Sequence, residues 1–473
     1  TAAADGVATA SGLERPRIGD LLDVEGVPAR VEAVGADSLR LVLLGDPRRV
    51  AVGQRVRRRE HPLELPVGPE LFGRVVDPLG QPLDGRGALA PGPWSAVELP
   101  PVPLVDRAPV TRPLHTGLFV VDTLIPVGRG QRQLVIGDQS TGKTELCLDL
   151  LAAQGEDTVG IYVAVGQRAS QIASRVEWLR ERGALERGFV VAGSADSPLG
   201  LIHQAPYSAC TMAESLMRRG WDVVIVYDDL TTHAHAHRSL ALLLGRPVGR
   251  EAFPVDVFYA HARLLERATQ LGPSRGGGSL TAFPVVETQG GDLTGYVPTN
   301  LVSITDGQIR LDAGLAAAGQ TPAVDVGLSV SRVGGKAQPK ALKQLAGQLK
   351  NDYAQFLELE IFTRLGTRLE EATQRVIDRG RRVREALKQP QGEPLDLVEV
   401  VLRVALLRTP EVVAVPLATL PAALAEAVDA LRRRDPELAR DIAAGRPLDP
   451  ERLASTLTVG RAVLAAATPK APA

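Results

Sequence analysis

The sequence contains little of what marks secreted, membrane-spanning or nucleic-acid-binding proteins. Its two cysteines, Cys147 and Cys210, lie far apart in apolar contexts and are predicted to be reduced core residues of a cytosolic protein. No stretch approaches about 18 uninterrupted apolar residues, and the first residues lack the basic start and apolar centre of a signal peptide. The 54 basic and 55 acidic residues nearly cancel, so nothing draws the whole chain to nucleic acid or an anionic membrane. We therefore expect a soluble chain that meets a membrane only through partners.

The 473 residues suffice for roughly three domains, and the character of the sequence changes along the chain. After a small-residue start that is predicted to be disordered, residues 18–56 alternate short apolar runs with turn residues, which predicts a small all-β sandwich or barrel. Residues 65–113 are rich in proline and glycine and are predicted to form a connector across a surface. Beyond Lys340, apolar residues recur at helical spacing.

The middle of the chain repeats a strand followed by a helix, which predicts a parallel sheet wound with helices. The expected strands are 135–138, 160–166, 188–194 and 222–229, and the expected helices are 144–154, 169–183, 207–220 and a last one that ends at 245.

Residues 133–144, QLVIGDQSTGKT, match the pattern G-x-x-x-x-G-K-[ST] without a mismatch. Glycines let phosphate oxygens approach the backbone N–H groups, the lysine neutralises β/γ-phosphate charge, and the hydroxyl of Thr144 suits Mg²⁺. The helix that follows adds a positive field at its N-terminus. The predicted phosphate-binding residues are Gly137, Asp138, Gln139, Ser140, Thr141, Gly142, Lys143 and Thr144.

A second acidic motif ends the apolar run DVVIVYDDL, residues 222–230. A carboxylate at the C-terminal end of a buried strand beside a phosphate loop can hold Mg²⁺ through its water shell, so Asp228 and Thr144 are the predicted metal ligands. Acidic residues that follow a buried strand are also common helix caps, and Asp229 directly follows Asp228 at the end of the same apolar run.

Two further clusters support weaker interpretations. The histidines of HAHAH, at 233 to 237, could bind a metal, but His233 and His237 lack a third ligand in sequence, and an exposed first helical turn is the expected reading. The basic run from Arg55 to Arg59 is expected to be a solvated strand edge rather than a nucleic-acid patch.

Six longer motifs together resemble the α subunit of a rotary F-type ATP synthase over about residues 12–460. That resemblance implies a multidomain α/β fold with an N-terminal β-barrel, a central P-loop (RecA-like) parallel-sheet domain and a C-terminal α-helical bundle. It places the domains at 1–64, 65–338 and 339–473. The motifs are VGRGQRQLVIGDQSTGKT, IYVAVGQRAS, IVYDDL, GREAFPVDVFYAHARLLERA, GGGSLTAFPVVETQGGDLTGYVPTNLVSITDGQI and VGLSVSRVG.

Gln167 bears on whether this chain's own site is catalytic. In the catalytic β subunit of this family a glutamate stands at the corresponding place and polarises the attacking water, whereas here the sequence reads Gly166-Gln167-Arg168. A neutral amide cannot do general-base work, which contributes roughly 10² to 10⁴ in rate. The α subunit likewise has glutamine, which implies a nucleotide-holding, non-catalytic site. Glutamine does position water in some GTPases, so catalysis stays open as the alternative.

The motif SVSRVGG implies a contribution to a neighbour's chemistry. In α subunits its arginine, here Arg332, reaches the γ-phosphate bound by an adjacent β subunit, and such fingers are worth roughly 10³ to 10⁵ in rate. Ser329 matches a family position needed for activity. Without the resemblance, Arg332 would read as a surface arginine in a glycine-flanked loop.

Around the base-binding pocket the resemblance is incomplete. Gln389 and Gln391 keep the two glutamines that contact adenine in the family. Gln139 and Ser140 replace the Arg and Gln usual in the phosphate loop, and Ala316 and Thr321 stand where an aromatic and an arginine are common. The sequence thus predicts bound ATP or ADP with Mg²⁺, at an affinity lower than is usual in the family.

The resemblance also implies partners and location. They are β subunits in an alternating α₃β₃ hexamer, a central γ stalk and a peripheral stalk, with the chain on the cytoplasmic face of the inner (plasma) membrane as a peripheral part of the complex. The short small-residue N-terminus departs from the family's longer stalk-docking segment, as in alternative bacterial enzymes, and the coupling ion, H⁺ or Na⁺, is chosen on another chain.

The sequence therefore favours a regulatory nucleotide-binding subunit of an ion-translocating ATP synthase. Two alternatives remain. One is a self-assembling catalytic hexameric ATPase of the secretion-motor type, which Gln167 opposes because such motors have glutamate there. The other is a Rho-type RNA translocase, which the balanced charge and the lack of an aromatic RNA-binding module oppose.

Overall fold

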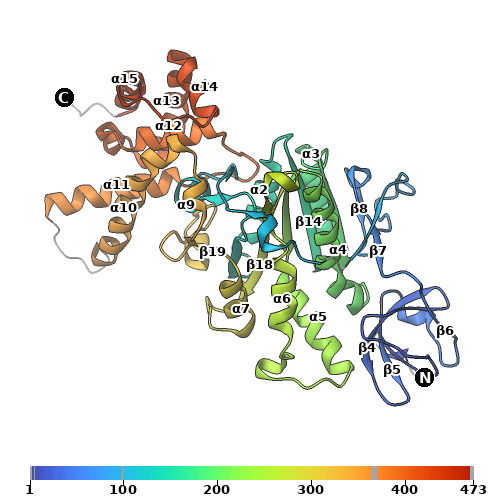
Figure 1. Ribbon diagram of the computed structural model, residues 1–473. Helices are drawn as coiled ribbons and strands as arrows, with labels where there is room; N and C mark the ends of the chain where they lie inside the picture. The colour runs from blue at the N-terminus through green and yellow to red at the C-terminus, as the bar shows by residue number, and fades with distance from the viewer. Residues whose placement is uncertain (1–2, 5, 98–99, 364–369, 469–473) are drawn as a thin grey trace. The chain divides into compact units, whose positions relative to one another are not determined.

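A computed structural model describes residues 3–4, 6–97, 100–363 and 370–468 (Figure 1). The chain divides into two compact units. The first unit comprises Thr1–Pro109, Arg129–Gln139 and Gln154–Gln308; the second comprises Val110–Gly128, Ser140–Ala153 and Ile309–Ala473. The predicted boundaries at 64/65 and 338/339 stay a prediction.

The N-terminal part of the first unit is a six-stranded antiparallel sheet in the order β1-β2-β5-β4-β3-β6. Side chains from alternate positions, such as Leu22, Val31 and Leu41, form its buried core. The prediction of a small all-β unit is confirmed. The prediction of a disordered start is wrong for β1 and β2, which pair with each other, while residues 1–2 and 5 lie outside the described residues. The strands are β1 (Ala3–Ala4), β2 (Val7–Ala10), β3 (Leu21–Val24), β4 (Val27–Val34), β5 (Leu39–Leu43) and β6 (Val56–Arg58).

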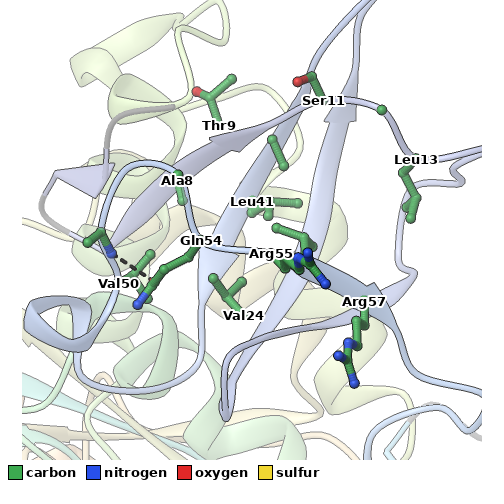
Figure 2. A pocket seen from close by; sticks show the side chains of 15 residues that line it. Ala8, Thr9, Ser11, Leu13, Val24, Leu41, Val50, Gln54, Arg55 and Arg57 are labelled. Atoms are coloured by element: carbon green, nitrogen blue, oxygen red, sulfur yellow. Dashed lines mark hydrogen bonds between the residues drawn. The ribbon is translucent and has the colours of Figure 1, made fainter.

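A groove of about 400 Å³ lies over this sheet (Figure 2). Its lining combines apolar residues of β2, β3 and β5 with the segment that leads into β6. Arg55 and Arg57 belong to that lining, and Arg55, Arg57, Arg58 and Arg59 are all exposed. Since β6 stands at one end of the strand order, the predicted solvated basic edge is confirmed. Charged side chains at such an edge oppose accidental strand pairing.

Residues 65–113 depart in part from the predicted surface connector. Leu65, Val67 and Leu71 are buried in the main core of the first unit. The strand β8 (Val75–Val76) pairs in parallel with β15 (Gly188–Ser194). Prolines limit strand length but do not prevent two- or three-residue strands between apolar anchors. The other short strands are β7 (Glu64–Pro66), β9 (Trp94–Ala96), β10 (Arg107–Ala108) and β17 (Thr269–Leu271).

The centre of the first unit is a parallel sheet in the order β13-β18-β16-β14-β15-β8. Nearly every residue of its long strands is buried, as expected when helices cover both faces of a parallel sheet. The predicted sheet of strand-then-helix units is confirmed. Its strands are β13 (Leu134–Asp138), β14 (Thr158–Gln167), β15 (Gly188–Ser194), β16 (Asp222–Asp228) and β18 (Ser279–Thr288).

The helices of the first unit are α3 (Ala169–Glu181), α4 (Leu199–Arg218), α5 (Leu230–Leu243), α6 (Val257–Leu265) and α7 (Tyr296–Ile304). The helix predicted at 207–220 begins eight residues earlier than expected, because Pro206 lies inside α4 instead of before it. Leu201 of α4 and Leu240 of α5 pack with Leu21 and Val42 of the N-terminal sheet. These contacts join the N-terminal sheet to the part of the first unit that holds the parallel sheet.

The second unit is mainly helical. The predicted helical pattern beyond Lys340 is confirmed, with α13 packed on α15 and α10 on α11. Its elements are α1 (Phe119–Leu124), α2 (Lys143–Ala152), α8 (Ala313–Ala317), α9 (Gly334–Ala337), α10 (Lys340–Thr363), α11 (Glu371–Ala386), α12 (Leu397–Leu407), α13 (Leu420–Arg434), α14 (Pro436–Ala443) and α15 (Pro450–Ala466), the short strands β11 (Pro113–Leu114), β12 (Val127–Gly128) and β20 (Val330–Ser331), and the end of β19 (Gly307–Leu311).

Neither cysteine forms a disulfide and both are buried in the core, as predicted, and burial raises the pKa of the Cys210 thiol to about 11. Among the described residues, no helix is both long enough and apolar enough to cross a membrane.

Candidate functional site

The phosphate-loop motif has the predicted order of strand, turn and helix. β13 ends at Asp138 and α2 begins at Lys143. Gly142, the residue before the helix, adopts a φ of 92° in the left-handed region, where a side chain would be strained. Ser140 has a φ of 60°. A turn of this kind aims successive backbone N–H groups into one concavity, which is the geometry that binds phosphate.

The residues at the start of α2 are held within the second unit. Thr141 and Lys143 are buried, with exposed fractions of 4% and 7%, and Thr144 is partly buried. Their positions at the first turn of a ten-residue helix place them in the positive field of its N-terminus. The side chains of Gln139 and Ser140 are exposed.

Asp138 supports its surroundings through its carboxylate. Its Oδ1 accepts hydrogen bonds from Thr288 Oγ1 at 2.5 Å and from the Gly291 backbone N–H at 2.8 Å. These bonds connect the end of β13 to the loop after β18. Because the carboxylate makes these bonds, the backbone of Asp138 is the part of this residue that could contact a bound phosphate.

The two acidic residues after β16 have different surroundings. Asp228 is 3% exposed, accepts a hydrogen bond from Tyr162 Oη at 2.7 Å and lies 3.5 Å from Arg175 Nη1. Asp229 caps α5 by accepting from the Thr232 N–H at 2.6 Å, and burial, with the nearby Asp228 charge, raises its pKa to about 6. The helix-cap reading therefore holds for Asp229, while the assignment of Asp228 as a metal ligand stays a prediction.

Gln167, at the end of β14, is hydrogen-bonded on both ends of its amide. Its Nε2 donates to the Asp228 carbonyl at 2.7 Å. Its Oε1 accepts from Arg175 and lies 3.1 Å from Tyr162 Oη, whose one hydrogen is donated to Asp228 at the shorter distance. Burial raises the pKa of the Tyr162 phenol well above its usual value, so it stays a neutral donor here. Tyr162 and Arg175 were not predicted, because a strand tyrosine and a helix arginine carry no sequence signal for this role.

The SVSRVGG segment, 329 to 335, forms a braced loop in the second unit. Ser329 is buried, donates to the Asp325 carbonyl at 2.6 Å and accepts from the Arg310 N–H at 2.9 Å. Ser331 Oγ donates to the Pro126 carbonyl at 2.6 Å. A β-carbon at Gly334 would lie 1.7 Å from the Pro126 oxygen, so only glycine fits there. The side chain of Arg332 is exposed on this fixed support.

The two glutamines predicted to contact adenine differ in exposure. Gln389 is 6% exposed, and its backbone N–H donates to the Thr321 carbonyl at 2.7 Å. Gln391 is exposed. The structure therefore brings Thr321 beside Gln389, while Ala316 lies partly buried in α8 without an aromatic ring to offer.

The prediction that His233 and His237 lie in an exposed first helical turn is wrong. Their exposed fractions are 0% and 8%, and they pack with His203 of α4 and His261 of α6. The ring centroid of His203 lies 4.8 Å from that of His233 and 5.1 Å from that of His237. Residues four apart share one helix face, and that face of α5 is the buried one. Among the described residues, no group of three or more ligating side chains is arranged to hold a metal.

This histidine cluster predicts a loss of stability in mild acid. Burial, with repulsion from neighbouring histidines and from Arg263, lowers the pKa of both His203 and His233, and Arg30 adds to this at His203. Burial lowers the pKa of His261 to about 3. Below about pH 6.5 the unfolded chain binds protons that the folded chain does not, so each such group costs up to about 1.4 kcal/mol per pH unit.

The thermal unfolding midpoint is therefore expected to fall between pH 7 and pH 5, and less steeply in His233→Phe, which keeps an aromatic ring in the stack. His61→Gln, at an exposed histidine, is the matched control and should follow the unaltered chain. Equal slopes for His233→Phe and the unaltered chain would contradict the assignment. His237 pairs with Asp256, itself paired with Arg246, and is left unchanged for that reason.

Comparisons with known proteins agree with the motifs. Residues 117–331 match the family described as "ATP synthase alpha/beta family, nucleotide-binding domain", and residues 338–460 match "ATP synthase alpha/beta chain, C terminal domain". A protein named "ATP synthase subunit alpha 2" from Albidiferax ferrireducens is 52% identical over 402 residues, 84% of this chain and 75% of its own length. A protein of the same name from Syntrophotalea carbinolica is 49% identical over 97% of this chain and 88% of its own length.

Proposed function

The chain belongs to the ATP synthase alpha/beta family as an F-type alpha subunit, and from this premise we propose that its own nucleotide site is regulatory and that it supplies Arg332 to a neighbouring catalytic site. Membership implies nucleotide binding and assembly with other ATP synthase subunits. The division of labour between the two sites is the proposal.

The proposed nucleotide is ATP or ADP, held by the backbone of Gly137 to Gly142 and by Lys143. The left-handed backbone at Ser140 and Gly142 and the α2 N-terminus support this, because both create an anion site. Mg²⁺ would be held by the Thr144 hydroxyl and the Asp228 carboxylate, oxygen ligands of the kind this ion prefers. The chemistry that Mg²⁺ would supply there is neutralisation of the phosphate charge.

The observation that carries the non-catalytic assignment is the environment of Gln167. Its amide is held by the Asp228 carbonyl, Tyr162 and Arg175, so it is fixed and neutral where a catalytic subunit has a glutamate. An amide in this position can orient groups but cannot take a proton from water. The hydrogen bond between Gln167 and Arg175 also keeps the Arg175 guanidinium beside Asp228. This fixed arrangement supports a site that binds nucleotide over one that hydrolyses it.

The assignment of Arg332 rests on its exposed side chain and on the rigid loop that carries it. A guanidinium that acts on a phosphate in another subunit must project from its own surface, and Arg332 is exposed. Next to it, Ser331 donates a hydrogen bond to the Pro126 carbonyl, and Gly334 donates to Ser331 and packs against Pro126. Ser329 would be a positioning residue, since its hydroxyl is used by Asp325 and Arg310. Its part in activity would then be to shape the loop.

The proposed assembly is an α₃β₃ hexamer around a γ stalk, with a peripheral stalk, and the membrane is met only through the complex on its cytoplasmic side. Closure of the N-terminal sheet into a barrel, packing of α10–α15 as a bundle, and domain limits of 1–64, 65–338 and 339–473 belong to the same proposal. The coupling ion, H⁺ or Na⁺, would be selected by residues of another chain.

The test is Mg-ATP hydrolysis by the purified chain alone, with its oligomeric state measured in the same preparation. Negligible turnover by a chain that does not form a hexamer is expected, because Gln167 supplies no base and no β subunit is present. Vigorous turnover from a homohexamer would contradict the assignment and would favour the secretion-motor alternative.

A further inference from the structure

Two segments of the second unit meet at Gly117. One is residues 114–122, which include the start of α1, and the other is residues 389–395, which contain Gln389 and Gln391. The Leu395 N–H donates to the Gly117 carbonyl at 2.9 Å. Gly117 has a φ of 71°, and a β-carbon there would lie 2.5 Å from the Ala153 β-carbon and 2.8 Å from that of Pro394. The segments are therefore packed without room for a side chain.

His115 joins the two segments through both ring nitrogens. Nδ1 lies 2.7 Å from Asp122 Oδ2, and Nε2 lies 2.7 Å from the Leu395 carbonyl oxygen. Both partners are acceptors, so the ring satisfies both contacts only when both nitrogens carry hydrogen, which is the charged imidazolium. Asp122 is 6% exposed and also accepts from Thr116 and from the Gly117 N–H, which fixes the carboxylate.

Gln389 is used inside the protein. Its Nε2 donates to the carbonyls of Gly117 and Glu393, both at 2.7 Å, and its Oε1 accepts from the Phe119 N–H at 2.9 Å. Both amide hydrogens are thereby engaged, so Gln389 shapes the loop instead of offering donors to a base. The Gly392 N–H donates to Asp149 Oδ1 of α2 at 2.8 Å, which ties the same loop to the helix that begins at Lys143.

We propose that His115, in its charged form, is a positioning residue that holds residues 389–395 in the shape that selects the nucleotide base. Gln391, exposed on this loop, then makes the contact with the base, and Gln389 and His115 fix where it stands. The inference rests on the proposed nucleotide site. It adds the residue that controls base selection there.

The electrostatic surroundings keep this charge at neutral pH. Burial opposes the charge, but the Asp122 carboxylate, the Leu395 carbonyl and the more distant Asp396 outweigh it and raise the pKa of His115 to about 9. Asp396 is paired in turn with Arg432. The loop is therefore expected to stay fixed below about pH 9 and to loosen above it.

The experiment compares ATP, ITP and inorganic tripolyphosphate binding, each with Mg²⁺, to the full chain and to His115→Gln. Loss of a charged hydrogen-bonding group is expected to weaken ATP about tenfold and to reduce the preference for ATP over ITP, while tripolyphosphate binding stays the same. His115→Arg keeps a charge, and because the native side chain is 34% exposed, solvent gives the longer group room. It should restore the preference and remove its decline above pH 9.

The remaining outcomes separate the inference from the function on which it rests. Hydrogen exchange of the backbone amides of residues 389–395 reports positioning without nucleotide and should rise in His115→Gln. If Gln391→Ala lowers the ATP preference but His115→Gln changes neither preference nor exchange, the role of His115 is refuted. If exchange rises but neither variant alters the preference, the loop is not a base site and the inference is overturned. Absence of ATP and tripolyphosphate binding by the unaltered chain would instead show that the proposed nucleotide site fails. Equal loss of ATP and tripolyphosphate would indicate structural damage and would also overturn the proposal.

Discussion

Replacing Arg332 by alanine is expected to lower ATP hydrolysis by the assembled complex by roughly 10³- to 10⁵-fold, the contribution typical of an arginine finger. The physical reason is that a planar guanidinium spreads its charge over the phosphoryl oxygens as their charge develops, and water cannot replace it in a closed site. Because Arg332 is exposed and its loop is held by Ser331 and Gly334, the substitution should leave the fold intact. Nucleotide binding to this chain should not change.

Two control variants sharpen this test. Lys336→Ala removes an exposed positive charge four residues away and should leave turnover close to normal. Arg332→Lys keeps the charge but not the two-pronged geometry and should recover only a small part of the rate. Normal turnover of an assembled Arg332→Ala complex would eliminate the finger assignment.

Much of the fold could be predicted because its signals are local. The apolar runs that became β13, β14, β15 and β16 are bounded by glycine or acidic residues, and a buried parallel strand needs little more than such a run. The errors arose where tertiary contacts override local pattern. Pro206 lies within α4, and Leu65 and Val67 of the proline-rich segment reach the core.

The candidate site was predictable to the extent that its chemistry is written in contiguous motifs. The phosphate loop and Asp228 could be predicted from the spacing of the motifs alone, but the side chains that contact Gln167 and Asp228 could not. Tyr162 and Arg175 come from a strand and a helix and meet Asp228 only in three dimensions. The burial of His233 was missed for a related reason, since the packing of α4 and α6 on α5 is not visible in the HAHAH pattern.

Replacing Lys143 by alanine is expected to weaken ATP binding to this chain roughly 10- to 100-fold, the effect of removing a charged hydrogen bond to phosphate. Lys143 is the first residue of α2 and is 7% exposed, and alanine is a good helix former, so the helix should persist. If this site is regulatory, the assembled complex should keep most of its hydrolysis, since the reacting phosphate is bound elsewhere.

The two readouts for Lys143→Ala together distinguish the two kinds of site. A catalytic site would lose binding and turnover together, whereas a regulatory site should lose binding alone. Lys350→Ala, at an exposed lysine of α10, controls for the loss of one positive charge and should change neither. An inactive complex that still assembles would count against a non-catalytic site, because then Lys143 would hold the phosphate that reacts and Gln167 would have to be reread as a residue that positions water.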